Sequence, residues 1–396
     1  EKQVCVFWLP SDLQLLSIIV CVLKPAMTAM SNRNQGFLTV CYYRWDKDKL
    51  KPDDLDTSLC THLILGFTEV EDSILSKGST DGDSSYQAVA NLKANNPSLK
   101  VMLSVGGGGK SRCFHEMVSD PSNTDRFVAC VVETLRRNNL DGIDVDWEFP
   151  MNIRNGKAHF SRLLQKLRTA FDDEAVASGQ PRLILSAAVA AQSVIVNSSY
   201  SVREIERYVD FINLMTYDLH LFKWYYPFSG HNSPLHGRRK ELGYFATLNI
   251  ASSAKLWVSK GMPKSKIVVG VPTYGLVWRL GHHKWHGVSC LTLGKATEGG
   301  GYITYPEVCQ VIADGGKRIF DKQSKVPYVV NKKHWISYDD INSVELKARW
   351  ILSEGYGGIM TFSLNCDDCT GATSPDGVRF PLHKKIKEVV EQESSH

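Results

Sequence analysis

One short segment, residues 141–150, carries carboxylates at alternate positions. It reads Asp-Gly-Ile-Asp-Val-Asp-Trp-Glu-Phe-Pro. Strand side chains alternate between two faces, so Asp144, Asp146 and Glu148 point one way, and the other face carries Ile143, Val145 and Trp147. Like charges in one low-dielectric site raise at least one pKa. Glu148, nearest the strand end, is the natural proton donor, and Asp146 can share a proton with Asp144 or bind a substrate group.

The same carboxylate row is compatible with two roles besides acid catalysis. It is typical of a buried polar layer that hydroxyl groups and water satisfy. Carboxylates are the ligands that Mg²⁺ and Ca²⁺ prefer, so a divalent-metal site is the second alternative. Loss of activity with a chelator would distinguish a metal site from acid catalysis.

The strands that position these carboxylates are expected in eight short apolar runs. Most runs are continuous rather than alternating, which is typical of parallel strands buried on both faces. The segments between most of them are long enough for a crossover helix. The runs are 37–43, 62–68, 100–105, 142–147, 182–189, 209–216, 266–272 and 358–363. Eight such units predict an α/β fold, the (β/α)8 TIM barrel, with functional residues at the carboxyl ends of its strands.

The spacing of the runs also predicts an insertion. The gap between the seventh and eighth runs is far longer than the others, and residues 278–335 are rich in glycine, aromatic residues and histidine. We expect a small α+β subdomain there, between strand 7 and helix 7. The barrel would then begin with residues 37–277 and be completed by residues 336–390.

Composition and the N-terminus limit the partners and the location. The 396 residues carry a net charge of only +4, which argues against a dedicated nucleic-acid-binding protein. The apolar run at 13–23 is too short to span a bilayer. It resembles the core of a secretory signal, so residues 1–30 are expected to be a cleaved leader, with a signal anchor or a buried helix as the alternatives. We expect a secreted, extracellular monomer without a stable membrane span.

Cysteines and one sequon fit a secreted protein. Of the ten cysteines, eight would remain without the leader, an even number that is typical of disulfides. Cys41 and Cys60 lie at the starts of neighbouring expected strands, so they are candidates for one bond. Cys113 and Cys130 would close a short loop around the third helix. Asn197 begins the one glycosylation sequon.

Several segments resemble one enzyme family. Asp141-x-x-Asp144-x-Asp146-x-Glu148 resembles the DxxDxDxE motif of the family-18 glycoside hydrolases, the chitinase family. Other segments resemble the same family in the same order, namely residues 40–43 with Trp45, 103–107, 215–218, 270–275 and 357–360. The resemblance spans roughly residues 37–385. It implies an animal-type chitinase or a chitinase-like lectin.

The resemblance also implies a role for each residue. Glu148 would protonate the glycosidic oxygen while the substrate's own N-acetyl oxygen attacks the anomeric carbon, a substrate-assisted, retaining mechanism. Asp146 would orient the acetamide, and Asp144 would hold the shared proton. No metal or organic cofactor is implied. Tyr217 and Asp218 complete the implied catalytic set, and the implied sugar-binding residues are Tyr42, Trp45, Gly107, Gly108, Met215, Tyr274 and Phe362.

The chain departs from the family pattern at aromatic positions. The family usually has Trp where this chain has Gly108, and Trp where it has Phe362. Leu276 replaces a polar or basic residue, and Trp224 lies one position from the usual aromatic. Each lost stacking contact would weaken sugar binding by about 1 kcal/mol or more.

Two functions therefore stay open. The intact carboxylates favour a hydrolase that cleaves chitin or chitooligosaccharides, and the lost aromatic positions favour a lectin that binds them with little or no turnover.

The resemblance further implies that Cys309 pairs near the C-terminus with Cys366 or Cys369.

Overall fold

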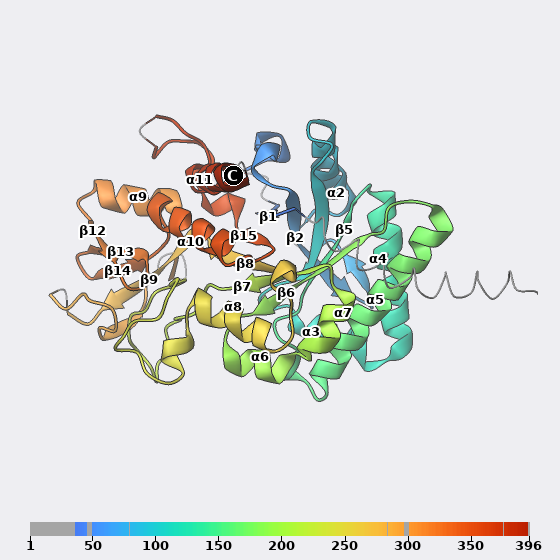
Figure 1. Ribbon diagram of the computed structural model, residues 1–396, viewed down its shortest axis with the longest axis horizontal. Helices are drawn as coiled ribbons and strands as arrows, with labels where there is room; N and C mark the ends of the chain where they lie inside the picture. Colours follow the sequence, from blue (N-terminus) through green and yellow to red (C-terminus); the bar gives the residue numbers. More distant parts are fainter. Residues whose placement is uncertain are drawn as a thin grey trace, which may run out of the picture. The chain divides into compact units, whose positions relative to one another are not determined.

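Eight parallel strands close into a barrel (Figure 1). Their order is β1-β15-β8-β7-β6-β5-β4-β2, and β1 pairs again with β2. Each expected run contains or overlaps one strand: β1 (Leu38–Arg44), β2 (His62–Glu71), β4 (Lys100–Gly106), β5 (Gly142–Asp146), β6 (Ile184–Ala190), β7 (Phe211–Met215), β8 (Ile267–Pro272) and β15 (Gly358–Phe362). The short β3 (Ile74–Ser76) pairs antiparallel with β2. The expected (β/α)8 barrel is confirmed.

The computed structural model describes residues 36–45, 50–78, 80–282, 284–296, 301–374 and 376–394. The expected leader at residues 1–30 lies outside them. Among the described residues, no helix is both long enough and apolar enough to cross a bilayer.

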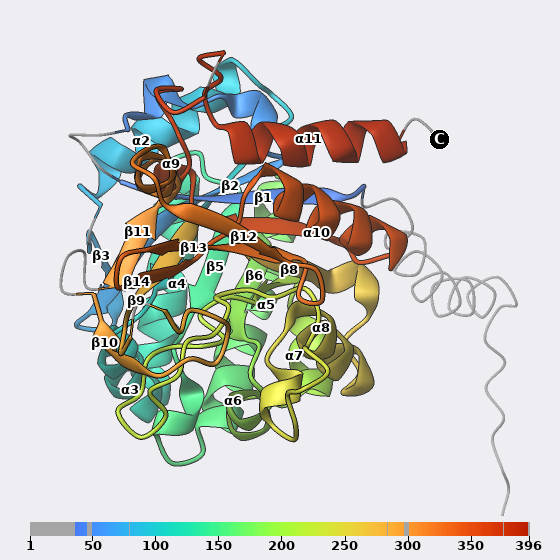
Figure 2. The same ribbon diagram turned by 90° about the vertical axis from the view of Figure 1, so that its left-hand side faces the viewer.

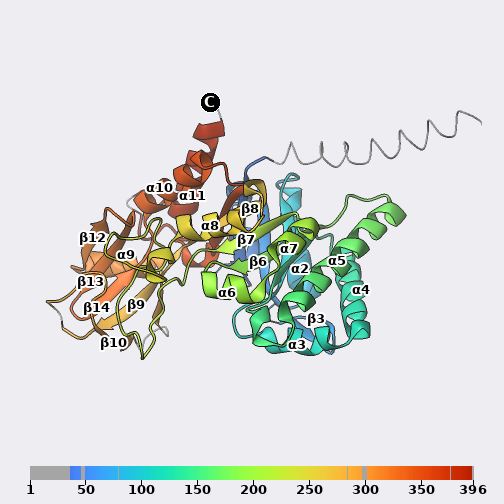
Figure 3. The ribbon, with the colours of Figure 1, turned by 60° about the horizontal axis from the view of Figure 1, so that its bottom comes forward.

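Helices cover the outside of the barrel, and α4 and α5 lie side by side (Figure 3). The outward face of β5 packs against this layer: the Trp147 ring, one residue beyond β5, stacks on Phe114 of α3 with ring centroids 5.1 Å apart. The helices are α2 (Asp83–Ala90), α3 (Ser111–Ser119), α4 (Pro121–Arg137), α5 (Gly156–Ser178), α6 (Ser193–Ser199), α7 (Val202–Tyr208), α8 (Ile250–Ser259), α10 (Ile341–Ser353) and α11 (Pro381–Ser394).

A second, antiparallel sheet is inserted after β8 and faces the viewer in Figure 2. Its order is β10-β9-β14-β13-β12, with β11 also paired to β9. Only Thr273 separates β8 from β9, so the sheet begins before residue 278, and it ends at Ser337. The elements are β9 (Tyr274–Leu280), β10 (Thr292–Lys295), β11 (Tyr302–Thr304), α9 (Tyr305–Ala313), β12 (Lys317–Asp321), β13 (Val326–Asn331) and β14 (His334–Ser337).

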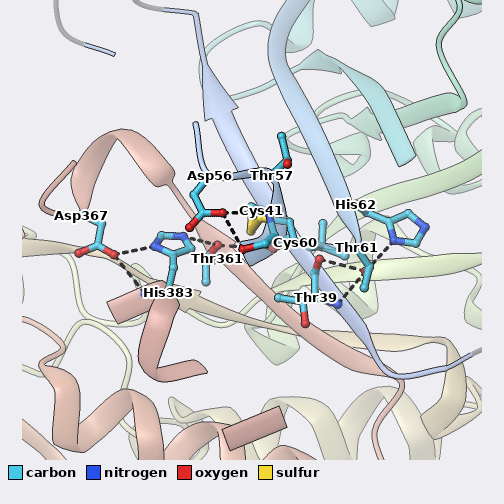
Figure 4. The surroundings of a disulfide bond; sticks show 12 residues. Thr39, Cys41, Asp56, Thr57, Cys60, Thr61, His62, Thr361, Asp367 and His383 are labelled. Carbon is cyan, nitrogen blue, oxygen red and sulfur yellow. Dashed lines mark hydrogen bonds and ion pairs between the residues drawn. A yellow bond between two sulfur atoms is a disulfide. The ribbon is translucent and has the colours of Figure 1, made fainter. Parts of the chain in front are cut away.

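One disulfide joins Cys41 of β1 to Cys60, just before β2 (Figure 4). The Cα atoms are 6.0 Å apart, and the pairing expected from the neighbouring strands is confirmed. Parallel strands cannot be joined by a short hairpin. The disulfide therefore provides a direct covalent link between β1 and the start of β2.

The other expected disulfides are wrong, because all five of their cysteines are free. The sulfur of Cys130 lies 3.9 Å from the Thr134 hydroxyl, one turn along its own helix, and does not meet Cys113. The Cys309 thiol lies within hydrogen-bonding reach of the Tyr305 and Thr373 side chains rather than in a disulfide. The remaining two, Cys366 and Cys369, lie in and just after a 3-10 helix that follows β15.

Candidate active site

The strand β5 carries the carboxylate row into the barrel mouth. Asp144 and Asp146 are buried within it, and Glu148 follows two residues after its end. Because β4 and β6 flank β5 in register, Ser104 and Ser186 stand directly beside Asp144. The alternation expected from the sequence therefore places all three carboxylates on the inner face.

Asp144, the deepest of the three, is saturated with hydrogen-bond donors. Tyr42 Oη donates to it at 2.6 Å. Its other donors are Ser104 Oγ at 2.9 Å, Ser186 Oγ at 2.7 Å and Asn213 Nδ2 at 3.0 Å. Burial raises the pKa of Asp144, and these four donors oppose that rise. Asp144 is thus a fixed carboxylate that receives charge-assisted hydrogen bonds from four strands.

Asp146 and Glu148 are the carboxylates with strongly altered acidity. Burial, followed by the charges of Glu148 and Asp144, holds the pKa of Asp146 well above its ordinary value. Among the described residues, Asp146 Oδ1 is buried without a hydrogen-bond partner. Burial and the nearby Asp218 carboxylate raise the pKa of Glu148 to about 7. A carboxylic acid with that pKa is protonated in a substantial fraction at neutral pH, as a general acid requires.

Asp218 follows β7 and is held by residues of the inserted sheet. Tyr274 Oη donates to Asp218 Oδ1 at 2.7 Å, and the Tyr302 hydroxyl is within hydrogen-bonding reach of the same carboxylate. Burial raises the pKa of Asp218, while these two phenols and the charge of Lys295 lower it. The insertion therefore contributes directly to the electrostatics of the barrel mouth.

These residues open into a single cleft of about 1050 Å³. Its floor is Phe362, whose ring lies 5.6 Å from that of Tyr42 and 5.8 Å from that of Tyr217. Of the residues implied for catalysis or sugar binding, the cleft is lined by Glu148, Asp146, Tyr217, Asp218, Tyr42, Gly108, Met215, Tyr274 and Phe362.

Other residues named from the sequence do not line this cleft. Asp141 lies at the opposite end of β5, where it pairs with Lys93 at 3.1 Å. Gly107 lies beneath the Phe67 ring, and its backbone N–H donates to the Asp146 carbonyl at 2.8 Å. Trp45 precedes residues 46–49, which lie outside the described chain. Of these three residues, Gly107 contacts the site through the Asp146 backbone, and Asp141 lies away from it.

The aromatic departures leave different amounts of space. A Cβ atom on Gly108 would have only Glu148 Oε1 within 4 Å, at 3.8 Å, so the space next to the Gly108 backbone is open. Phe362 leaves less room, because four other aromatic rings surround it with centroids 5.6–6.3 Å away. Leu276 is buried in the core.

Sequence reasoning missed two sets of residues. The partners of Asp144 (Ser104, Ser186 and Asn213) are polar residues that interrupt otherwise apolar buried strands, and that interruption is a signal visible in the sequence. The second set belongs to the connection between β7 and α8, residues 216–249. It supplies Leu221, Tyr226, Phe228, Phe245 and Leu248 to the cleft, and no periodicity marks these positions.

Comparison with known proteins identifies the family. The sequence pattern of "Glycosyl hydrolases family 18" matches residues 38–367. The chain belongs to glycosyl hydrolase family 18. The assignment drawn from the DxxDxDxE motif is therefore confirmed. Within this family 18 chain, no described group of three or more His, Cys, Asp or Glu side chains is arranged to hold a metal ion.

Similar family 18 proteins differ in activity. Chitotriosidase-1 of Mus musculus is 36% identical over 366 residues, covering 88% of this chain and 77% of that protein. TsES1 of Trichuris suis, an immunomodulatory active chitinase, superposes with a TM-score of 0.84 at 32% identity, over 89% of this chain and 100% of that one. Human YKL-39, a pseudo-chitinase with retained chitooligosaccharide binding, superposes with a TM-score of 0.84 at 32% identity, over 90% of this chain and 100% of that one.

Proposed function

We propose that this chain is a chitinase that hydrolyses β-1,4 linkages between N-acetylglucosamine units with retention of configuration. The observation that carries the proposal is the protonatable Glu148 at the end of a buried carboxylate row, with a pKa of about 7. Chitotriosidase-1 and TsES1 are relatives whose names point to the same chemistry.

Glu148 is the general acid of the proposed reaction. It donates its proton to the glycosidic oxygen as the bond to the anomeric carbon breaks, which keeps the leaving sugar neutral. Its open neighbour Gly108 leaves room for a sugar beside the acid. After departure of the leaving group, the same carboxylate removes a proton from the water that opens the intermediate.

Asp146 prepares the nucleophile, which is the carbonyl oxygen of the substrate's own acetamide. Its buried Oδ1 can accept the acetamide N–H. That hydrogen bond would turn the carbonyl oxygen toward the anomeric carbon and stabilise the positive charge of the oxazolinium ion. The Tyr217 hydroxyl lines the same cleft and holds the acetamide from the other side.

A second candidate function is chitooligosaccharide binding with little or no turnover. Gly108 and Phe362 favour it, because both offer less aromatic surface for a sugar ring than the tryptophan usual in the family. Human YKL-39 combines the same fold with retained binding. This alternative shares the cleft and differs only in whether Glu148 completes a proton transfer.

We further propose a secreted monomer that binds chitin or chitooligosaccharides and no nucleic acid. The Cys41–Cys60 disulfide suits an oxidising compartment. Asn197 lies exposed on α6, where a glycan can be attached. Protein secreted into the medium should change its electrophoretic mobility when an N-glycosidase removes the glycan, and the Asn197→Gln variant should show no such change. This experiment tests both the location and the modification.

Hydrolysis of a fluorogenic N-acetylchitooligosaccharide by the wild type and by Glu148→Gln tests the proposed function. We expect wild-type turnover that is unaffected by a chelator, and a loss of about 10³-fold or more in the variant, with oligosaccharide binding retained as proof of folding. A folded wild type that binds but does not turn over would support the lectin instead. Loss of wild-type turnover with the chelator would favour the metal alternative.

A further inference from the structure

Part of the cleft is lined by apolar side chains that have no role in the proposed catalytic reaction. It consists of five side chains from the β7–α8 connection, here called the apolar wall: Leu221, Tyr226, Phe228, Phe245 and Leu248. They line the same cavity as Glu148 and Asp218. The apolar wall is therefore continuous with the proposed catalytic site.

The apolar wall is built as a packed unit. The Tyr226 and Phe245 rings stack with centroids 4.4 Å apart and planes 17° apart, and Phe228 lies edge-on to Tyr226 at 5.2 Å. Leu248 is buried, while Phe228 keeps 37% of its surface exposed. Because Tyr226 and Phe245 cover one face of each other, neither offers the two free faces of an isolated sugar-stacking platform.

Two polar groups of the cleft are already bonded to backbone carbonyls. The His220 ring nitrogen Nδ1 is 2.9 Å from the His231 carbonyl, and burial lowers the pKa of His220 to about 4, so this ring is neutral. Gln192 Nε2 donates to the Asp218 carbonyl oxygen at 3.4 Å. Lys223 is the charged side chain that the β7–α8 connection adds to the cleft beyond Asp218.

We propose that the apolar wall binds an alkyl or aryl group carried by an N-acetylated sugar. The ligand class is an amphiphilic glycoside: its sugar lies at the carboxylates, and its apolar group lies against the apolar wall. This inference rests on the proposed sugar recognition and extends it, because an unsubstituted oligosaccharide has no such group. Burial of apolar surface then adds affinity that grows with the size of the group.

Binding of a homologous series tests the proposal. The probes are the methyl, butyl, hexyl and octyl β-glycosides of N,N′-diacetylchitobiose, each titrated calorimetrically below its micelle concentration into full-chain Glu148→Gln. We expect the dissociation constant to fall about two- to fourfold per buried methylene group. Octyl β-glucoside, which lacks the acetamide, controls for nonspecific binding. No dependence on chain length, either in this series or in a series with a fatty acyl chain in place of the distal N-acetyl group, would overturn the proposal.

Variants of the apolar wall separate it from other surfaces. Phe245→Ala in the same background should flatten the chain-length dependence and leave the affinity for the methyl glycoside unchanged. Leu242→Ala changes an exposed loop residue outside the cleft and should leave the dependence intact. Phe228→Ser, at the exposed edge of the wall, is the second test if Phe245→Ala does not fold.

Further experiments determine which end of the sugar carries the apolar group and whether the wall binds sugar rings instead. A fatty acyl chain in place of the distal N-acetyl group tests the other end of the sugar, and dependence in either series supports the proposal. If Phe245→Ala weakens unsubstituted tetramer binding as much as octyl-glycoside binding, the wall is a sugar surface and the proposal is wrong. Chain-length-dependent binding without any wild-type hydrolysis would refute the catalytic proposal alone.

Discussion

The carboxylates and the apolar wall line the same cleft but are built in opposite ways. Asp144 and Asp146 sit on a barrel strand, and four strands, two of them paired directly with β5, supply donors to Asp144. The apolar wall sits on a long connection, where the rings of Tyr226 and Phe245 pack on each other. The barrel strands hold the carboxylates in place, whereas the loops that follow the strands shape the part of the cleft that a ligand enters.

The same contrast holds within the carboxylate row. Asp144 is deep and fully hydrogen-bonded, so its surroundings hold it in place. Asp146 has a buried oxygen without a partner among the described residues, and burial with Asp218 nearby raises the pKa of Glu148 to about 7. The roles we propose for these three residues, a support, an acetamide acceptor and a proton donor, follow from what surrounds each one.

The largest expected effect is a difference in kcat between variants at the two ends of β5, with Asp146 at the carboxyl end and Asp141 just before the amino end. Asp146→Asn keeps the shape of the side chain but removes the carboxylate charge that would stabilise the positively charged oxazolinium ion, so kcat should fall by about 10²- to 10³-fold. Asp141→Asn is the matched change on the same strand and should alter stability with little effect on kcat, since Asp141 pairs with Lys93 away from the cleft. Similar losses of kcat in both variants would contradict the assigned roles.

The second-largest effect is a difference in stability between a tyrosine that bonds to Asp144 and a tyrosine of the β7–α8 connection. Tyr42→Phe removes a buried donor to Asp144, so the free energy of unfolding should fall by about 2 kcal/mol in urea denaturation. Tyr225→Phe removes a hydroxyl from an exposed ring of the β7–α8 connection and should change it by less than about 0.5 kcal/mol. Equal effects would mean that the donors of Asp144 do not stabilise the barrel.

The pH dependence of kcat/KM tests the coupling between Glu148 and Asp218. Glu148 must be protonated, so the rate should fall as pH rises through about 7. Because the Asp218 charge helps to raise that pKa, Asp218→Asn should lower it and move the alkaline limb to lower pH. Glu307→Gln, another cleft carboxylate, should leave the limb in place; an unmoved limb in Asp218→Asn would exclude the coupling.

The smallest expected effect restores an aromatic surface beside the acid. Gly108 has open space around it, so Gly108→Trp should bind N-acetylchitooligosaccharides tighter by about 1 kcal/mol, or roughly fivefold in Kd. Gly109→Trp provides the control, because the φ of +84° at Gly109 disfavours any side chain. Unchanged affinity in a folded Gly108→Trp would show that the missing ring does not limit binding.

The barrel and its charged end were predictable because both follow from short-range patterns. Continuous apolar runs mark buried parallel strands, and alternation on one strand places Asp144, Asp146 and Glu148 on one face. The Cys41–Cys60 bond followed from the same strand order. The start of the insertion was harder to place, since β9 continues almost directly from β8.

The unpredicted parts depend on contacts between distant segments. Cys309 forms no disulfide, and its thiol lies within hydrogen-bonding reach of Thr373; spacing along the chain does not reveal which residue folds back there. Tyr302 reaches Asp218 only because β11 pairs with β9 and brings Tyr302 beside Tyr274, with ring centroids 5.7 Å apart. The apolar wall likewise arises from a connection without helical or strand periodicity.

The most direct test of the proposed mechanism is the requirement for the acetamide. Wild-type rates would be measured for matched fluorogenic glycosides of N,N′-diacetylchitobiose and of cellobiose, which differ in the 2-substituent that supplies the nucleophile. The arrangement of Asp146 and Glu148 predicts turnover of the first and none of the second. Comparable hydrolysis of both glycosides would contradict substrate-assisted catalysis in this cleft.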